Sequence, residues 1–109
     1  MSAVQTPAAP RYDVTLFICQ GEQMTPLGRS RDVSESGLFL ETAQRPTLGS
    51  LITIALVWGE GTFTCQARVA RHADEGVGLS FVDPDPAFKG AIAEILETSR
   101  PVRGREAPS

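Results

Sequence analysis

An acid, two hydroxyls and a glycine stand at fixed spacing in the stretch RSRDVSESGLFLET, residues 29–42. Ser34 and Ser36 can form hydrogen bonds with nearby backbone groups, and Asp32 can accept from amides of a turn. Gly37 can adopt the positive φ that tight turns between strands often require. The same groups could also form half of a ligand site. The residue types alone leave both interpretations open.

Enzyme signatures are missing from the sequence. The single histidine, His72, stands in RHADEG, where we expect a turn. Ser34 is not part of the G-x-S-x-G motif of hydrolases, and the chain has neither a G-x-x-x-x-G-K-[ST] loop nor a G-x-G-x-x-G motif. Glu94 and Glu97 are expected on the solvent side of a helix, so they predict no catalytic carboxylate pair. The sequence therefore predicts a protein that is not an enzyme.

The charge of the chain argues against nucleic-acid polymers as partners. The formal net charge is −3 and the isoelectric point is about 5.0, whereas proteins that bind DNA or RNA neutralise phosphates with Lys and Arg. The five Phe, one Trp and one Tyr form no stacking stripe. Arginine, which suits phosphate and guanine recognition, supplies every cationic side chain except Lys89. A GC-rich genome produces the same bias.

Neither a metal site nor a membrane segment is expected. Cys19 and Cys65 do not lie in a C-x-x-C pair, which argues against zinc, and Cys65 occupies a core position of an alternating strand. No apolar run approaches the roughly 20 residues that a membrane span needs. The first ten residues lack the basic and apolar regions of a signal peptide. We therefore expect no metal, no membrane insertion and a cytoplasmic location.

Composition divides the chain into three parts. Residues 1–10, MSAVQTPAAP, are rich in Ala and Pro and predict a flexible arm. Residues 100–109, RPVRGREAPS, are polar, contain two prolines and predict a disordered tail. The folded domain should therefore span residues 11–99.

Alternation of apolar and polar residues with a period of two dominates this domain and predicts strands. Turn residues separate six such segments: Tyr12–Cys19, Leu27–Val33, a segment starting at Gly37, Leu51–Trp58, Thr62–Arg71 and Val77–Val82. Most of the turns are short, which favours antiparallel neighbours.

The last part of the domain predicts one helix over residues 86–98. Four apolar residues recur at helical spacing: Phe88, Ile92, Ile95 and Leu96. Asp85 is suited to the N-cap position, and Pro86 to the first helical position. Six short strands followed by a helix favour a mainly β fold. We expect a small six-stranded antiparallel barrel with one C-terminal α-helix that covers a barrel opening or its rim.

The ordered set of segments resembles the PilZ domain family, bacterial modules that receive the second messenger cyclic di-GMP. The family signature [D/N]-x-S-x-x-G is matched by Asp32, Ser34 and Gly37. The segments GLFLET, PTLGSLITIAL and GVGLSF also match, so the resemblance covers residues 11 to about 96. It implies a six-stranded barrel with a C-terminal helix, and cyclic di-GMP as the ligand to consider. No other cofactor is expected.

The resemblance also implies a second signature, an R-x-x-x-R arm just before the first strand. Arg11 matches the second arginine of this arm, but Pro7 occupies the position of the first, and TPAAP contains no cation. Guanidinium groups can bind phosphate bidentately, stack on a base or contact guanine O6 and N7. Loss of one bidentate arginine typically costs about 1–3 kcal/mol, or roughly 5- to 150-fold in affinity.

Two other arginines could compensate for the missing one. Arg29 and Arg31 are expected on one face of a strand, where they could approach an anion beside the turn. They could equally be two solvated charges on that strand. The sequence does not decide between these alternatives.

We therefore expect a non-catalytic regulatory adaptor of the PilZ type that acts through protein–protein contact. Its degenerate cyclic di-GMP site would consist of four residues: Arg11, Asp32, Ser34 and Gly37. Family members without the full arm often act through protein partners, which implies motility, type IV pilus or surface-behaviour signalling here. The alternative is a working cyclic di-GMP receptor, in which Arg29 and Arg31 support the same four residues.

Contact with a regulatory protein partner needs an exposed surface. Phe17, Phe39 and Trp58 are candidates for one contiguous apolar patch. The sequence does not identify the partner. Pairing of two chains, through the helix or through a sheet edge, is a further alternative.

Overall fold

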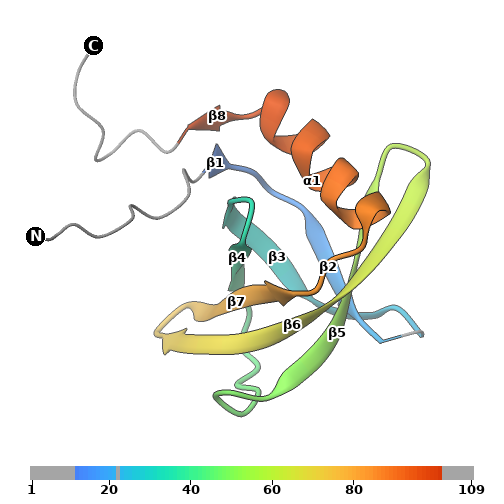
Figure 1. Cartoon of the computed structure of the whole chain (residues 1–109). Coiled ribbons are helices and arrows are strands. Elements are labelled where there is room, and N and C mark those ends of the chain that lie inside the picture. Colours follow the sequence, from blue (N-terminus) through green and yellow to red (C-terminus); the bar gives the residue numbers. More distant parts are fainter. Residues whose placement is uncertain (1–11, 22, 102–109) are drawn as a thin grey trace, which may run out of the picture.

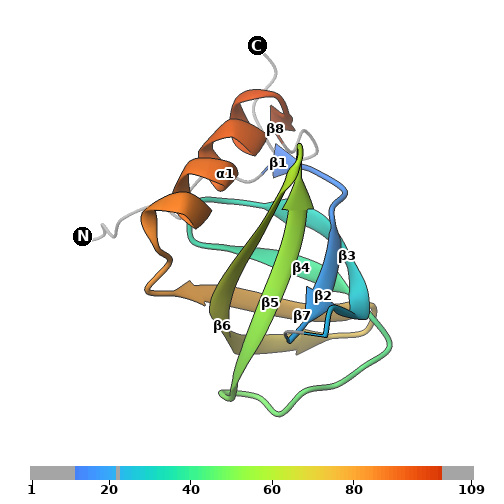
Figure 2. The same cartoon turned by 90° about the vertical axis from the view of Figure 1, so that its right-hand side faces the viewer.

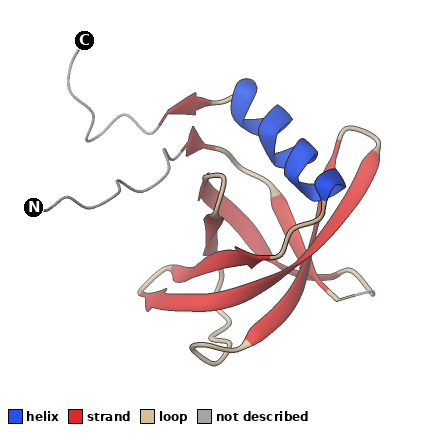
Figure 3. Cartoon of the chain, viewed as in Figure 1, coloured by secondary structure: helices blue, strands red, loops and turns tan. Residues whose placement is uncertain are grey.

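The computed structural model describes residues 12–21 and 23–101, and strands make up most of them (Figures 1 and 3). Six antiparallel strands close into a barrel in the order β2-β5-β6-β7-β4-β3, because β2 also pairs with β3. Their bounds are Phe17–Gln20 (β2), Thr25–Val33 (β3), Gly37–Glu41 (β4), Leu51–Trp58 (β5), Gly61–Ala73 (β6) and Gly76–Val82 (β7). The helix α1 (Pro86–Glu97) follows them. The predicted fold class is confirmed.

Two further strands of two residues each extend the sheet. β1 (Tyr12–Asp13) pairs with β3 and with β8 (Arg100–Pro101). The prediction of one continuous strand over Tyr12–Cys19 is therefore wrong, and the first two residues of the predicted tail form a ladder. The predicted arm, residues 1–10, and the rest of the tail, residues 102–109, lie outside the described residues.

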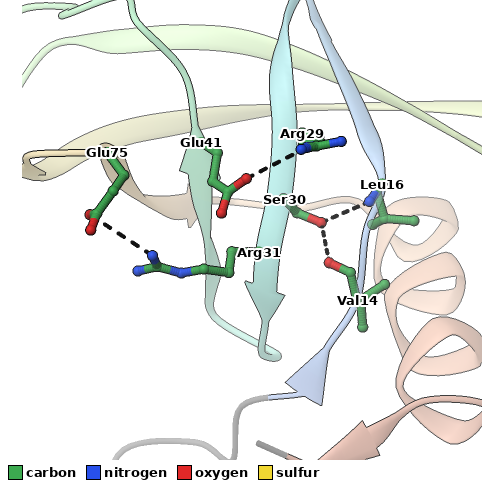
Figure 4. Close-up of polar contacts among 7 residues, drawn as sticks. All are labelled: Val14, Leu16, Arg29, Ser30, Arg31, Glu41 and Glu75. Carbon is green, nitrogen blue, oxygen red and sulfur yellow. Dashed lines mark hydrogen bonds and ion pairs between the residues drawn. The ribbon is translucent and has the colours of Figure 1, made fainter.

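A buried serine of β3 explains the break between β1 and β2 (Figure 4). Ser30 is 2% exposed. Its hydroxyl donates to the carbonyl of Val14 at 2.6 Å and accepts from the amide of Leu16 at 2.9 Å. The amide of Ser30 donates to the carbonyl of Leu16 at 2.9 Å. Residues 14–16 therefore stay close to β3 through the side chain of Ser30 together with two backbone hydrogen bonds, and they form no strand there.

The inward-facing residues of the strands fill the barrel. The buried cluster includes Ile18, Leu27, Val33, Leu38, Leu40, Ile54, Leu56, Ala67, Val69, Val77 and Leu79. Cys65 belongs to the same cluster, as its position in the alternating segment predicts, and burial raises the pKa of its thiol. Cys19 is half-buried. The period-two pattern thus identifies most of the core.

The helix α1 lies across one end of the barrel (Figure 2). Asp85 caps it as predicted, since its Oδ1 accepts from the amide of Phe88 at 2.8 Å. Phe88, Ile92 and Ile95 are buried, whereas Leu96 is half-buried. Full burial of each such side chain contributes about 1.5–3 kcal/mol. In the described part of the chain, no helix has the length and apolar character needed to cross a membrane.

β4 and β7 approach each other more closely than side chains permit, at both ends of their ladder. A Cβ on Gly37 would overlap the carbonyl oxygen of Leu79, and a Cβ on Gly76 would overlap that of Leu40. Only glycine lets the two backbones meet in this way. The expectation of a positive φ at Gly37 is wrong, because Gly37 is not among the described residues with positive φ. The requirement for glycine is steric.

The buried bonds of Ser30 give a first prediction. We expect Ser30→Ala to lower the free energy of unfolding by about 2–3 kcal/mol, because it leaves the buried amide of Leu16 and the partly buried carbonyl of Val14 without their partner. Urea denaturation measures the loss. Ser50→Ala is the control, since it removes an exposed hydrogen bond to the carbonyl of Thr47 and should cost less than about 0.5 kcal/mol. Equal losses in the two variants would contradict the role of Ser30.

The close contact between β4 and β7 predicts that an alanine at Gly37 destabilises the protein, whereas an alanine at a glycine outside this contact does not. Gly37→Ala should lower the free energy of unfolding by about 3 kcal/mol or more, since the backbones must separate. Gly90 lies in α1, where an added Cβ would meet nothing within 4 Å, so Gly90→Ala should raise it by about 0.5–1 kcal/mol. Urea denaturation compares the two. A Gly37→Ala protein as stable as the parent would overturn the steric argument.

Candidate functional site

The turn between β3 and β4, residues 34–36, is closed by its own side chains. The hydroxyl of Ser34, a residue 1% exposed, accepts from the amide of Ser36 at 3.2 Å and donates to the carbonyl of Gly37 at 3.3 Å. The amide of Ser34 donates to the same carbonyl at 2.8 Å. The amide of Phe81 donates to the carbonyl of Ser36 at 2.9 Å and ties the turn to β7. These bonds give Ser34 a structural role.

Asp32 lies on β3, two residues before the turn. Asp32 is half-buried, and its backbone pairs with that of Asp13 in β1. Arg11 lies outside the described residues, but Tyr12, the residue after it, pairs with Val33. The chain therefore enters the described structure beside the last residue of β3, directly before the turn.

Arg29 and Arg31 are both engaged by carboxylates, and in Figure 4 they extend to different sides of β3. Arg29 Nε lies 3.5 Å from Glu41 Oε1, and Arg31 Nη1 lies 3.9 Å from Glu75 Oε1. Both arginines are exposed, on either side of the buried Ser30, and the register between β3 and β4 shifts between Ser30 and Asp32. Arg29 also stands about 16 Å from the turn along an extended strand. The structure does not bring the two arginines together.

Phe39 faces outward from β4, since it alternates with the core residues Leu38 and Leu40, yet it is 1% exposed. Two guanidinium groups lie over its ring: Arg31 Cζ is 4.1 Å from the ring centroid, and Arg71 Cζ is 5.4 Å from it. Cation–π contacts of this kind contribute about 0.5–2 kcal/mol each. Arg31 therefore covers an aromatic side chain as well as pairing with a carboxylate.

The expected apolar patch of Phe17, Phe39 and Trp58 does not form. Phe17 is 74% exposed, but Phe39 is buried and Trp58 is half-buried against the core. Trp58 Nε1 donates to Glu94 Oε1 at 3.0 Å, which links the hairpin of β5 and β6 to α1. The other large exposed hydrophobic residues of the described chain are Leu48, Leu51 and Val57.

A shallow depression of about 140 Å³ lies beside the turn on the outer side of the barrel. Its lining includes Ser34, Ser36, Gly37, Arg71, Gly78 and Ser80. Arg71 is the one charged residue among the described residues of this lining. The depression thus joins the signature turn to a guanidinium from β6.

Sequence reasoning missed Arg71 because simple alternation would place it in the core with Val69. A register shift between Val69 and Arg71 turns the arginine outward. The available signal was Gly78, which pairs with Arg71, because a Cβ on Gly78 would lie 3.0 Å from Arg71 Cγ. A glycine opposite a long side chain leaves room for that side chain to lie flat on the sheet.

Comparison with known proteins agrees with this architecture. No curated protein matches the sequence. Among solved structures, the chain is similar to the Bacillus subtilis inhibitor of motility MotI/DgrA, with 15% identity and a TM-score of 0.66. The match covers 86% of this chain and 51% of that one, so this chain spans about half of its length. At this identity the likeness shows the fold alone.

A sequence profile carries the assignment to a family. The profile of the PilZ domain matches residues 5–98, which is most of the chain and includes the signature turn. PilZ domains are non-catalytic modules that bind cyclic di-GMP. The six-stranded barrel and its C-terminal helix are the fold that the resemblance implies. The chain therefore belongs to the PilZ domain family.

Proposed function

We propose that this chain is a regulatory adaptor that acts through protein–protein contact, with a cyclic di-GMP site too incomplete for tight binding. One observation carries the proposal. The depression beside the signature turn holds a single described guanidinium, that of Arg71, whereas Arg29 and Arg31 are paired with carboxylates elsewhere. Exposed ion pairs of this kind are weak, but neither of these two arginines lines the depression, and Arg31 lies over the ring of Phe39 instead.

The chemistry of the nucleotide explains why one guanidinium is too few. Cyclic di-GMP has two phosphates and two guanines, and each bidentate arginine contributes about 1–3 kcal/mol to such recognition. The depression of about 140 Å³ is far smaller than the roughly 300–1,000 Å³ of typical ligand pockets. Tight binding would therefore depend on an arm that closes over the ligand, and Pro7 removes one of its two cations.

Recruitment of Arg31 to a phosphate would have a cost inside the protein. Arg31 lies over the ring of Phe39 and pairs with Glu75. Its movement would expose part of an aromatic side chain whose full burial contributes about 1.5–3 kcal/mol. A phosphate contact of about the same size would leave little net gain. This balance supports Arg31 as a structural residue.

The likeness to a motility inhibitor supports a place for the adaptor in motility, type IV pilus or surface-behaviour control. We place its action in the cytoplasm, with a regulatory protein as the partner. A second candidate function is a cyclic di-GMP receptor. Arg71 favours the receptor, because its guanidinium lines the depression together with Ser34 and Gly37 and does not depend on the N-terminal arm for this position. In that case Arg11 would supply the second cation.

Restoration of the arm tests the degenerate site. We expect the parent protein to give no heat in calorimetry with about 100 μM cyclic di-GMP. Pro7→Arg rebuilds R-x-x-x-R with Arg11 and should strengthen binding by roughly 5- to 150-fold, the effect of one bidentate arginine. Ala8→Arg is the matched control, because it adds the same charge one residue away from the signature position.

Two outcomes would contradict this proposal. Micromolar binding by the parent protein that is lost in both Arg11→Ala and Asp32→Ala would establish the receptor instead. An equal gain for Pro7→Arg and Ala8→Arg would mean that charge, and not the arm position, limits binding.

A complementation experiment separates the adaptor from the receptor in the cell. In a strain that lacks this chain, we expect the parent protein and Arg11→Ala to restore swimming or twitching equally, because an adaptor does not need the nucleotide. Gly37→Ala is the negative control, since it disrupts the barrel. If the parent protein restored motility and Arg11→Ala did not, this result would contradict the adaptor function.

A further inference from the structure

A mostly apolar groove of about 570 Å³, whose lining also includes Glu35, Lys89 and Glu97, runs between α1 and the strands next to it. Three aromatic residues contribute to its lining: Tyr12 from β1, Phe81 from β7 and Phe88 from α1. The rings of Phe81 and Phe88 meet edge-on, with centroids 5.0 Å apart. Ala93 and Leu96 of α1 also line it. The volume lies within the range of typical ligand pockets.

The signature turn separates this groove from the depression described above. Glu35, at the middle of the turn, lines the groove, whereas Ser34 and Ser36 on either side of it line the depression. Tyr12 is at the same time a lining residue of the groove and the first described residue of the chain. Whatever precedes Tyr12 therefore begins at the edge of the groove.

The sequence that precedes Tyr12 has the composition of a groove-binding segment. Residues 2–10, SAVQTPAAP, contain no charged side chain. Pro7 and Pro10 form a P-x-x-P motif, and a polyproline II helix has three residues per turn, so both prolines share one face. Segments of this type dock in grooves lined by aromatic side chains. The groove offers such a lining.

The length of the segment also fits. Nine residues in polyproline II conformation extend about 28 Å, whereas the 12 residues of α1 span about 18 Å. A chain that turns back at Arg11 can therefore follow the groove along the whole helix. Pro7 and Pro10 would lie near its start, because both stand within one or two turns of such a helix from Arg11.

We propose that residues 2–10 of this chain dock in the groove between α1 and the signature turn, with Pro7 and Pro10 against its aromatic side chains. Strong intrinsic affinity is not required. Effective concentrations for short tethers are in the millimolar range, so an intrinsic dissociation constant of about 1 mM fills the groove roughly half of the time. The docking does not require the nucleotide to be present.

Docking would place the arm on the α1 side of the turn, away from the depression. A partner that uses the groove would have to displace the segment, and an arm held there would not cover a nucleotide. Pro7 would then be part of a contact, in addition to being the position that lacks an arginine.

Nuclear magnetic resonance of the full chain tests the proposal. We expect Overhauser contacts between protons of residues 7–10 and the ring of Phe81, a half-buried residue of the groove lining. Deletion of residues 2–10 should shift the resonances of the groove residues beyond the immediate neighbours of the deletion. Ala93→Arg, which fills the groove, should abolish the contacts. Ala87→Arg should not, because Ala87 is an exposed residue of α1 that does not line the groove.

Three results would overturn the proposal. The first is an absence of contacts in the full chain together with unchanged groove resonances after the deletion. The second is a dependence of the contacts on protein concentration, which would assign the segment to a second copy of the chain. The third is persistence of the contacts in a Pro7→Ala and Pro10→Ala double variant, which would exclude recognition through P-x-x-P.

Discussion

The close contact between the backbones of β4 and β7 is the constraint on which the barrel and its turn depend. Gly37 stands at one end of this ladder and Gly76 at the other, and at each of them a Cβ would overlap a carbonyl of the facing strand. The contact fixes the position of the first residue of β4 relative to β7. It also allows the amide of Phe81 to reach the carbonyl of Ser36. The position of the signature turn therefore follows from the packing of two strands.

This constraint changes how the signature is interpreted. Gly37 is required by the approach of β7, and the hydroxyl of Ser34 is used within the turn. Both residues would be needed in a barrel of this shape that never meets a nucleotide. Their presence identifies the fold, but by itself it is weak support for binding. Whether the chain is a receptor or an adaptor depends on the cations around the turn, because they interact with the negative charge of the ligand.

Regular periodicity explains which features could be predicted from the sequence. The six barrel strands, the helix and the cap at Asp85 follow from period-two and helical patterns that hold along uninterrupted elements. The features that were predicted wrongly or missed lie where a β-ladder is interrupted. A register shift turns Arg71 outward, and the side chain of Ser30 bonds to residues 14–16, where the ladder with β3 is interrupted. Such shifts depend on the partner strand, so one segment read alone does not contain them.

Pro7 takes part in both proposals made for this chain. On the side of the depression, it removes a cation that an arm would bring to a phosphate. In the sequence, it also completes the P-x-x-P motif that we propose to dock in the groove along α1. An arginine at this position would bring a second cation to a nucleotide, whereas a proline restricts the backbone to conformations such as polyproline II. If residues 2–10 dock as we propose, the same substitution that weakens the arm as a nucleotide ligand also contributes to the contact with the groove.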